Sequence, residues 1–219
     1  NPIRNADATA AFANSEFKIF REQIAKGAVA RAIPAPGAGA KPRSFFDKMI
    51  GFAQENGAKG LAYVIFEGGA GKGPIAKLLS EDEQAQIREL AGVGDGDAVF
   101  FTCAAQGDAE RLAGLVRTRA GEELDVIEKD AFRFCWIVDY PMYEYDDKAK
   151  KIDFSHNPFS MPQGGLEALE SKYPLEILAY QYDIVCNGVE LCSGAIRNHE
   201  PATMVKAFEI AGYTAQDVE

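Results

Sequence analysis

Cysteine is scarce in this sequence, and the few that occur form no metal-binding pattern. The four cysteines lie inside apolar runs and include no CxxC pair: Cys103, Cys135, Cys186 and Cys192. Cysteine in such surroundings behaves as a small hydrophobic residue. The sequence therefore predicts buried free thiols, and it argues against a zinc site or a disulfide framework.

Positive charge and long apolar runs are lacking as well. The chain has 23 Lys and Arg against 33 Asp and Glu, a net charge of −10 that repels phosphate backbones. Autonomous nucleic-acid binding is therefore not expected. No run reaches the 18 or more apolar residues, as an approximate minimum, that a membrane helix needs, and the N-terminus has no signal-peptide pattern. We expect a cytoplasmic protein with no membrane partner.

What is present is the composition of a globular protein. The chain has 219 residues, of which 47% are hydrophobic and 26% charged, enough for one large or two modest domains. In the first half, helix and strand patterns alternate, and Ser80 with Glu83 forms a capping-box sequence. The expected strands are 17–23, 29–33, 60–66 and 98–104, and the expected helices begin near Ser44, Ser80 and Asp108. This order predicts an α+β fold, with a two-layer α/β domain over residues 1–119.

A charged segment, residues 120–131, follows and is expected to be a linker to a second domain over residues 132–219. Residues 132–139 (FRFCWIVD) alternate like a strand, with Trp136 expected to face a core. The second domain is organised around residues 181–197, QYDIVCNGVELCSGAIR. Asn187-Gly188 is the strongest short-range signal for a two-residue hairpin turn.

This turn fixes a register for the hairpin. The pairs it predicts are Cys186 with Val189, Val185 with Glu190, and Asp183 with Cys192. Asp183 and Glu190 then become diagonal neighbours on one face, with backbones about 7 to 8 Å apart. Two carboxylates at that spacing can share a divalent cation, but they can equally be solvated acids on a wet face. Arg197 falls on the opposite face unless a bulge intervenes, and we expect one at Ser193-Gly194.

The string YDIVCNGVELCSGAIR, preceded by HNPFS at 156–160, resembles the catalytic core of the aspartyl-tRNA synthetases, which are class II enzymes. Residues from about 15 to 119, with FKIF, FFDKMIGFAQENGAKGLAYV and DGDAVFFTCA, are similar to the GAD-type insertion domain. Bacterial members of the family share this domain with glutamyl-tRNA amidotransferase subunits. The resemblance implies an insertion domain followed by part of a class II antiparallel-sheet catalytic domain.

The resemblance also implies a function and a site. Family members are homodimers that activate aspartate with ATP as aspartyl-adenylate and transfer it to tRNA(Asp), and in some cases also to tRNA(Asn). By this resemblance, His156 and Arg197 would bind aspartate, Glu190 would bind ATP, and Asp183 with Glu190 would hold Mg²⁺. No residue is expected to form a covalent intermediate.

The sequence departs from the family pattern in places. Many members have three glycines where this chain has Cys192-Ser193-Gly194, and many have histidine in place of Asn157. Motifs for ATP-binding arginines, the dimer interface and the anticodon-binding barrel are missing, as is an initiating methionine. We therefore expect an internal fragment that is inactive alone. The alternative is a noncatalytic RNA-binding or scaffolding module related to amidotransferase subunits, which would not be expected to carry residues 132–219.

Overall fold

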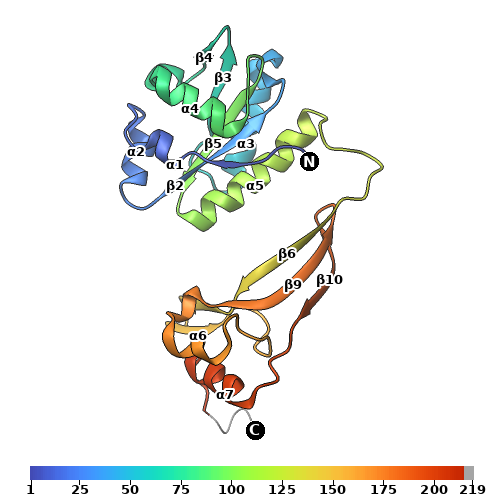
Figure 1. Ribbon diagram of the computed structural model, residues 1–219. Coiled ribbons are helices and arrows are strands. Elements are labelled where there is room, and N and C mark those ends of the chain that lie inside the picture. The colour runs from blue at the N-terminus through green and yellow to red at the C-terminus, as the bar shows by residue number, and fades with distance from the viewer. Residues whose placement is uncertain (215–219) are drawn as a thin grey trace. The chain divides into compact units, whose positions relative to one another are not determined.

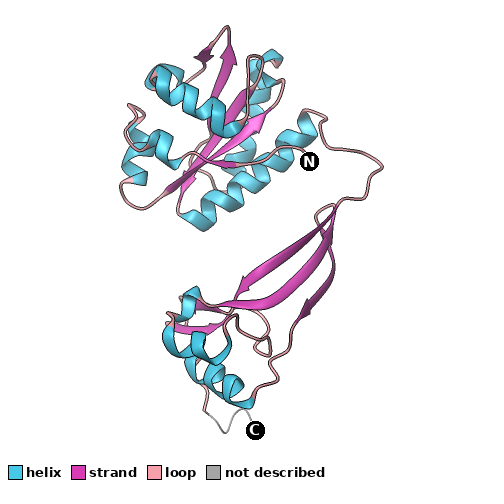
Figure 2. Cartoon of the chain, viewed as in Figure 1, coloured by secondary structure: helices cyan, strands magenta, loops and turns pink. Residues whose placement is uncertain are grey.

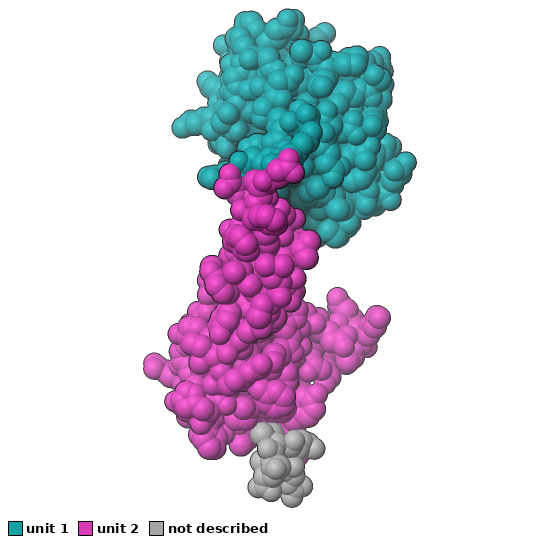
Figure 3. Space-filling view, turned by 90° about the vertical axis from the view of Figure 1, so that its right-hand side faces the viewer, with its two compact units in different colours: residues 1–129 teal, residues 130–219 magenta. Residues whose placement is uncertain are grey.

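The computed structural model describes residues 1–214. The chain forms two compact units, called unit 1 (residues 1–129) and unit 2 (residues 130–219) below (Figure 3). Among the described residues, no helix combines the length and the apolar character needed to cross a bilayer. The assignment of residues 132–219 to a catalytic domain stays a prediction.

Unit 1 is built on a five-stranded antiparallel sheet (Figure 1). The strand order across the sheet is β1-β2-β5-β3-β4, with β5 at the centre. The strands are β1 (Ala6–Asp7), β2 (Val29–Ala35), β3 (Ala62–Glu67), β4 (Ala70–Lys72) and β5 (Ala98–Ala104).

Helices cover both faces of this sheet (Figure 2). Alternation along β5 sends Val99 and Phe101 into one core and Phe100 into the other. The first core is closed by α1 (Thr9–Phe12), α2 (Lys18–Ile24) and α4 (Glu81–Ala91), and the second by α3 (Arg43–Glu55) and α5 (Gln106–Glu123). Short 3-10 turns occur at Ala38–Ala40 and Ala76–Leu78. The α+β class is confirmed, but the sheet lies between two helical layers, so the expected two-layer arrangement is incomplete.

Two expectations for unit 1 are wrong in detail. Residues 17–23 were expected to form a strand, yet Lys18–Ile24 is the helix α2. Phe17 and Phe20, three residues apart, enter the same core, a spacing that suits a helix and not a strand. The predicted linker begins too early, because α5 runs to Glu123 and buries Ala120 inside the second core.

The capping box, by contrast, is confirmed. The Glu83 backbone N–H donates to Ser80 Oγ at 3.2 Å, and the Ser80 backbone N–H donates to Glu83 Oε2 at 2.8 Å. These two bonds satisfy donors that the first turn of α4 would otherwise leave unpaired.

Unit 2 combines a long, exposed sheet with a small core at one end of it (Figure 1). The three antiparallel strands are β6 (Phe134–Pro141), β9 (Leu178–Cys186) and β10 (Val189–Ala195), in the order β10-β9-β6. A two-stranded ribbon, β7 (Tyr143–Asp146) and β8 (Lys151–Phe154), packs with α6 (Gly165–Ser171), the 3-10 turn Pro174–Glu176 and α7 (Pro201–Ile210).

Much of the three-stranded sheet is exposed, with no cover from the described residues of unit 2. Trp136 was expected to face a core, but it is 60% exposed and touches Tyr182 edge-to-face. The cysteine expectation also fails in part, because Cys135 and Cys192 are exposed, although all four cysteines are free thiols. Alternation along β6 and β9 places apolar residues on both faces of the sheet, and the sequence alone could not show which of them stay exposed.

Candidate functional site

The β9–β10 hairpin turns at the predicted dipeptide. Asn187 has φ 51° and Gly188 has φ 84°, the left-handed pair that a tight two-residue turn requires. The Asn187 side chain also fixes the start of β6, since its Oδ1 accepts from the Arg133 N–H at 3.0 Å and its Nδ2 donates to Ala131 O at 2.8 Å. The predicted pairs Cys186–Val189 and Val185–Glu190 are confirmed.

Beyond Glu190 the predicted register is wrong. The ladder shifts between Glu190 and Cys192, so Leu191 is the extra residue of a β-bulge. Cys192 therefore pairs with Ile184, and Ser193 takes the place opposite Asp183. A bulge was expected at Ser193-Gly194, and the structure places it two residues earlier.

The position of the bulge decides which side chains share a face. Paired residues of neighbouring strands lie on the same side of a sheet, and a one-residue shift exchanges the two sides. After the bulge, Ser193 and Ala195 lie on the face of Asp183, and Cys192 moves to the other face. Two residues further on, Arg197 bridges Ser160 and reaches the same side.

All four predicted site residues line one pocket of about 260 Å³ on this face: His156, Asp183, Glu190 and Arg197. The sequence reasoning missed the other side chains that shape it, above all Tyr140 and Gln181. A bulge was expected to bring Arg197 to the face of the two acids, and the bulge at Leu191 has that effect.

Tyr140 forms a hydrogen bond with one of the two acids. Its hydroxyl donates to Asp183 Oδ2. The hydrogen bond to Asp183, together with burial and the negative charges of Asp183 and Glu190, raises the pKa of Tyr140 to about 12. The phenol is therefore a neutral hydrogen-bond donor near neutral pH.

The loop that carries His156 is tied to the sheet by Gln181. The Gln181 amide, itself buried, donates to Asn157 O at 3.1 Å and to Ser160 Oγ at 2.8 Å. The His156 ring lies beside the Tyr140 ring, with centroids 5.1 Å apart. These contacts hold an exposed histidine at the rim of the pocket, on the side of the acids.

The carboxylates of the pocket can be compared with the ligands that Mg²⁺ prefers. Within residues 1–214 there is no group of three or more His, Cys, Asp or Glu side chains placed to hold a metal ion. Asp183 and Glu190 supply two carboxylates, and Tyr140 occupies only one oxygen of Asp183. Magnesium commonly binds through one or two carboxylates plus substrate phosphates, with water completing the shell. The residues present fit that kind of site and not a closed protein cage.

The first of the two units contains a known domain. Residues 20–113 match the GAD domain. The whole chain is similar to curated proteins called aspartate–tRNA(Asp/Asn) ligase. It is 59% identical over 213 residues to that of Zymomonas mobilis, a match covering 97% of this chain and 36% of the relative.

Two further relatives of the same name give the same result. The chain is 58% identical over 219 residues to the ligase of Gluconobacter oxydans and 58% identical over 224 residues to that of Rickettsia felis. Each match covers 100% of this chain and 37% of the relative, so the chain spans little more than a third of the proteins it matches. The resemblance to bacterial-type aspartyl-tRNA synthetases with a GAD domain is confirmed.

Proposed function

We propose that this chain supplies part of the aspartate-activating site of an aspartate–tRNA ligase. The observation that carries the proposal is the pocket itself, where the bulge at Leu191 brings Arg197 to the face of Asp183 and Glu190. In such a pocket, the arginine can bind the carboxylate of an anionic amino acid, and the two acids can bind a cation that carries a phosphate chain. The names of the relatives support this reading.

Arg197 would recognise the side-chain carboxylate of aspartate. Its guanidinium forms no ion pair with any other residue of the described chain, so its donors are available to a ligand. A planar guanidinium engages both oxygens of a carboxylate, whereas the amide of asparagine would turn donors toward donors. Rejection of asparagine would follow from that mismatch.

His156 would lie at the other end of the same amino acid, near its α-amino or α-carboxylate group. Its loop is pinned by Gln181 to the strand that carries Asp183, so the histidine and the carboxylate are positioned by one element. Holding the aspartate at both ends would fix the direction of its α-carboxylate. Such positioning supplies a large part of the acceleration in a bimolecular reaction.

Asp183 and Glu190 would hold Mg²⁺ and, with it, the phosphates of ATP. When bound, the metal would neutralise phosphate charge and keep the phosphates in line for displacement. Tyr140 would keep one Asp183 oxygen occupied and so orient the other oxygen. The aspartate α-carboxylate would then attack the α-phosphate to give aspartyl-adenylate and pyrophosphate, with no covalent enzyme intermediate.

The acceptor in the second step would be tRNA(Asp), and the names of the relatives extend the proposal to tRNA(Asn). We further propose that the full-length enzyme is a homodimer. The proposal gives unit 1 no role in this chemistry, since the residues that line the pocket all belong to unit 2.

A segment exchange tests the proposal directly. The matching segment of the Gluconobacter oxydans ligase, 58% identical to this chain, would be replaced by these 219 residues. We expect the chimera to aminoacylate both purified tRNAs with aspartate, and the chimera carrying Arg197→Leu with Asp183→Asn to lose that activity. A folded, dimeric chimera without aspartate-dependent activity would contradict the proposal, and so would a double variant as active as its parent.

A further inference from the structure

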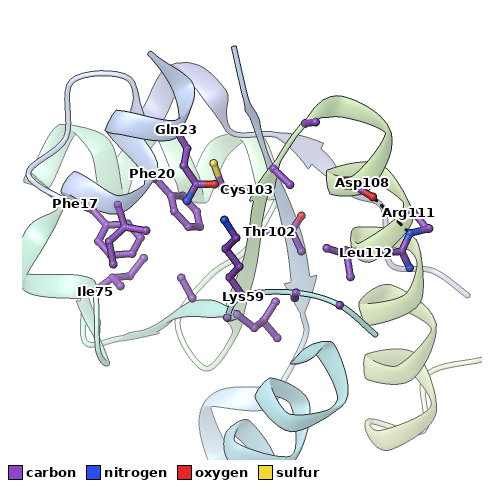
Figure 4. A pocket seen from close by; sticks show the side chains of 18 residues that line it. Phe17, Phe20, Gln23, Lys59, Ile75, Thr102, Cys103, Asp108, Arg111 and Leu112 are labelled. Atoms are coloured by element: carbon purple, nitrogen blue, oxygen red, sulfur yellow. Dashed lines mark ion pairs between the residues drawn. The ribbon is translucent and has the colours of Figure 1, made fainter. Parts of the chain in front are cut away.

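Unit 1 contains a cavity that the proposed aspartate site does not use. Its volume is about 530 Å³, and it opens between α2, the end of β5 and the first turns of α5 (Figure 4). Pockets that bind small molecules have volumes of about 300 to 1,000 Å³. The cavity therefore has the size of a ligand site, and it lies almost entirely within the GAD domain.

One side of the cavity is apolar. Figure 4 shows Phe17, Phe20 and Ile75 together on this side, with Leu112 across from them. The Phe17 and Phe20 rings lie 4.8 Å apart and are only 9% and 7% exposed. A flat or branched apolar group could lie against these rings and be removed from water, which is favourable in proportion to the area buried.

A single cation occupies the middle of the cavity. The Lys59 side chain extends between the apolar side and β5, with its amino group toward Gln23 and Cys103 (Figure 4). Across the described chain, Lys59 makes no ion pair or side-chain hydrogen bond, and neither does the Gln23 amide. Both groups are free to bind a ligand.

The other charged side chains of the cavity, Asp108 and Arg111, do not neutralise the positive charge of Lys59. Asp108 and Arg111 face each other with 3.9 Å between Oδ1 and Nε, and Arg111 also donates to Asn56 O at 3.2 Å. Helix α5 begins here with Ala105 as its N-cap, which has no side chain to accept from the first turn. Its 18 residues direct their positive dipole end toward this edge. The cavity is thus locally positive in a chain whose net charge is −10.

Cys103 adds no negative charge. Burial raises the pKa of its thiol to about 11, so the group stays neutral at physiological pH and contributes to the apolar wall. The cavity therefore offers an apolar body site beside one unpaired ammonium group and an amide.

We propose that this cavity binds a small organic carboxylate whose apolar body lies on Phe17, Phe20 and Ile75 and whose carboxylate meets Lys59. The Gln23 amide would donate a second hydrogen bond to the same carboxylate. This site would make the GAD domain a ligand-binding module, independent of the aspartate pocket in unit 2.

The test is a titration of the ¹⁵N-labelled 219-residue chain with naphthalene-1-acetate, compared with the uncharged 1-naphthaleneacetamide of nearly the same shape. We expect saturable shifts of the amide signals of Thr102, Cys103 and Ala105, with the carboxylate binding about tenfold or more tighter than the amide. Lys59→Gln should abolish this preference. Lys59→Arg should keep it, and Lys41→Gln, which removes another exposed, unpaired lysine that lies outside the cavity, should leave it unchanged.

Four results would each overturn the proposal. One is the absence of saturable shifts in unit 1 of the unmodified chain. Another is a set of shifts confined to the exposed aromatic strands of unit 2. The third is equal affinity of the unmodified chain for the acid and the amide, and the fourth is an acid preference that survives Lys59→Gln.

Discussion

Arg197 and Glu190 line the same pocket, but the proposed function assigns aspartate to Arg197 and magnesium-bound ATP to Glu190. Substituting each residue separately in the full-length enzyme should therefore affect the use of different substrates. Arg197→Leu removes a charged donor pair that has no partner in the described chain. A charge-assisted contact of this kind contributes about 1.5 to 3 kcal/mol. At about 1.4 kcal/mol per factor of ten, kcat/KM for aspartate should fall about 10- to 150-fold.

The effect of Arg197→Leu on ATP should be small, because the arginine is assigned to the amino acid. Glu190→Gln should do the reverse. It removes one anionic oxygen of the proposed magnesium pair, so KM for ATP and the magnesium concentration needed for half-maximal rate should both rise. The assay is aspartate-dependent exchange of pyrophosphate into ATP, measured against each substrate in turn.

Two exposed residues outside the pocket provide matched controls. Arg4→Leu and Glu144→Gln make the same chemical changes, and neither should alter the exchange. The reasoning is refuted if both pocket variants lose aspartate and ATP use to the same extent, or if either behaves like its control. In that case the face carrying Asp183 would not be the floor of an active site.

Three further predictions concern the 219-residue chain. It should show no aspartate-dependent pyrophosphate exchange, because it spans only 37% of its relatives and we expect ATP-binding arginines elsewhere in the whole enzyme; exchange above a protein-free blank would contradict this. Ser80→Ala should lower the free energy of unfolding in urea by about 1 kcal/mol, and Ser44→Ala, inside α3 and not a cap, should cost less. The raised pKa of Tyr140 stabilises the folded state fully below the unfolded pKa near 10, and this stabilisation is lost as pH rises toward about 12. Unfolding measured at pH 8 and pH 11 should therefore show a smaller loss with pH in Tyr140→Phe than in the unmodified chain; equal losses would mean that the bond to Asp183 does not form.

Local signals in the sequence were reliable where one or two residues decide the backbone. The Ser80-Glu83 capping box and the Asn187-Gly188 turn both form as predicted, because each depends on short-range hydrogen bonds or on positive φ. Helix α2 was mistaken for a strand because a seven-residue segment gives too few repeats to separate the two periods. The shared core position of Phe17 and Phe20, with Ile19 exposed between them, distinguishes the helix from a strand.

The candidate site could be predicted as a set of residues but not as an arrangement. Asp183, Glu190 and Arg197 were identified, and the bulge needed to bring the arginine to the face of the acids was expected, but at Ser193-Gly194 and not at Leu191. The exact place of the bulge leaves little trace in the sequence, because Leu191 is an ordinary apolar residue in an apolar strand. Gln181 was missed for a different reason, since its bonds to the loop at Asn157 and Ser160 connect segments that lie 21 to 24 residues apart.

The three-stranded sheet has two register shifts, one in β6 and one in β10, on either side of β9. Both bring side chains to the face of β9 that carries Asp183. In β6 the register shifts between Val138 and Tyr140, so Tyr140 pairs with Ala179 on the face of Asp183, where an unbroken ladder would put it on the opposite face. Asp139, with φ 58°, is the residue that turns the chain, and its carboxylate accepts from Gln163 at 2.7 Å.

In β10 the extra residue Leu191 likewise moves Ser193, and Arg197 beyond it, to the face of Asp183. Each shift costs a paired position in the ladder, and a left-handed conformation at a non-glycine residue such as Asp139 adds strain. Both shifts deliver polar side chains to one face of one central strand and leave the other face to Trp136, Tyr180 and Tyr182. A regular hairpin with the same side chains would divide them between two faces, so the pocket depends on the bulges as much as on the residues that line it.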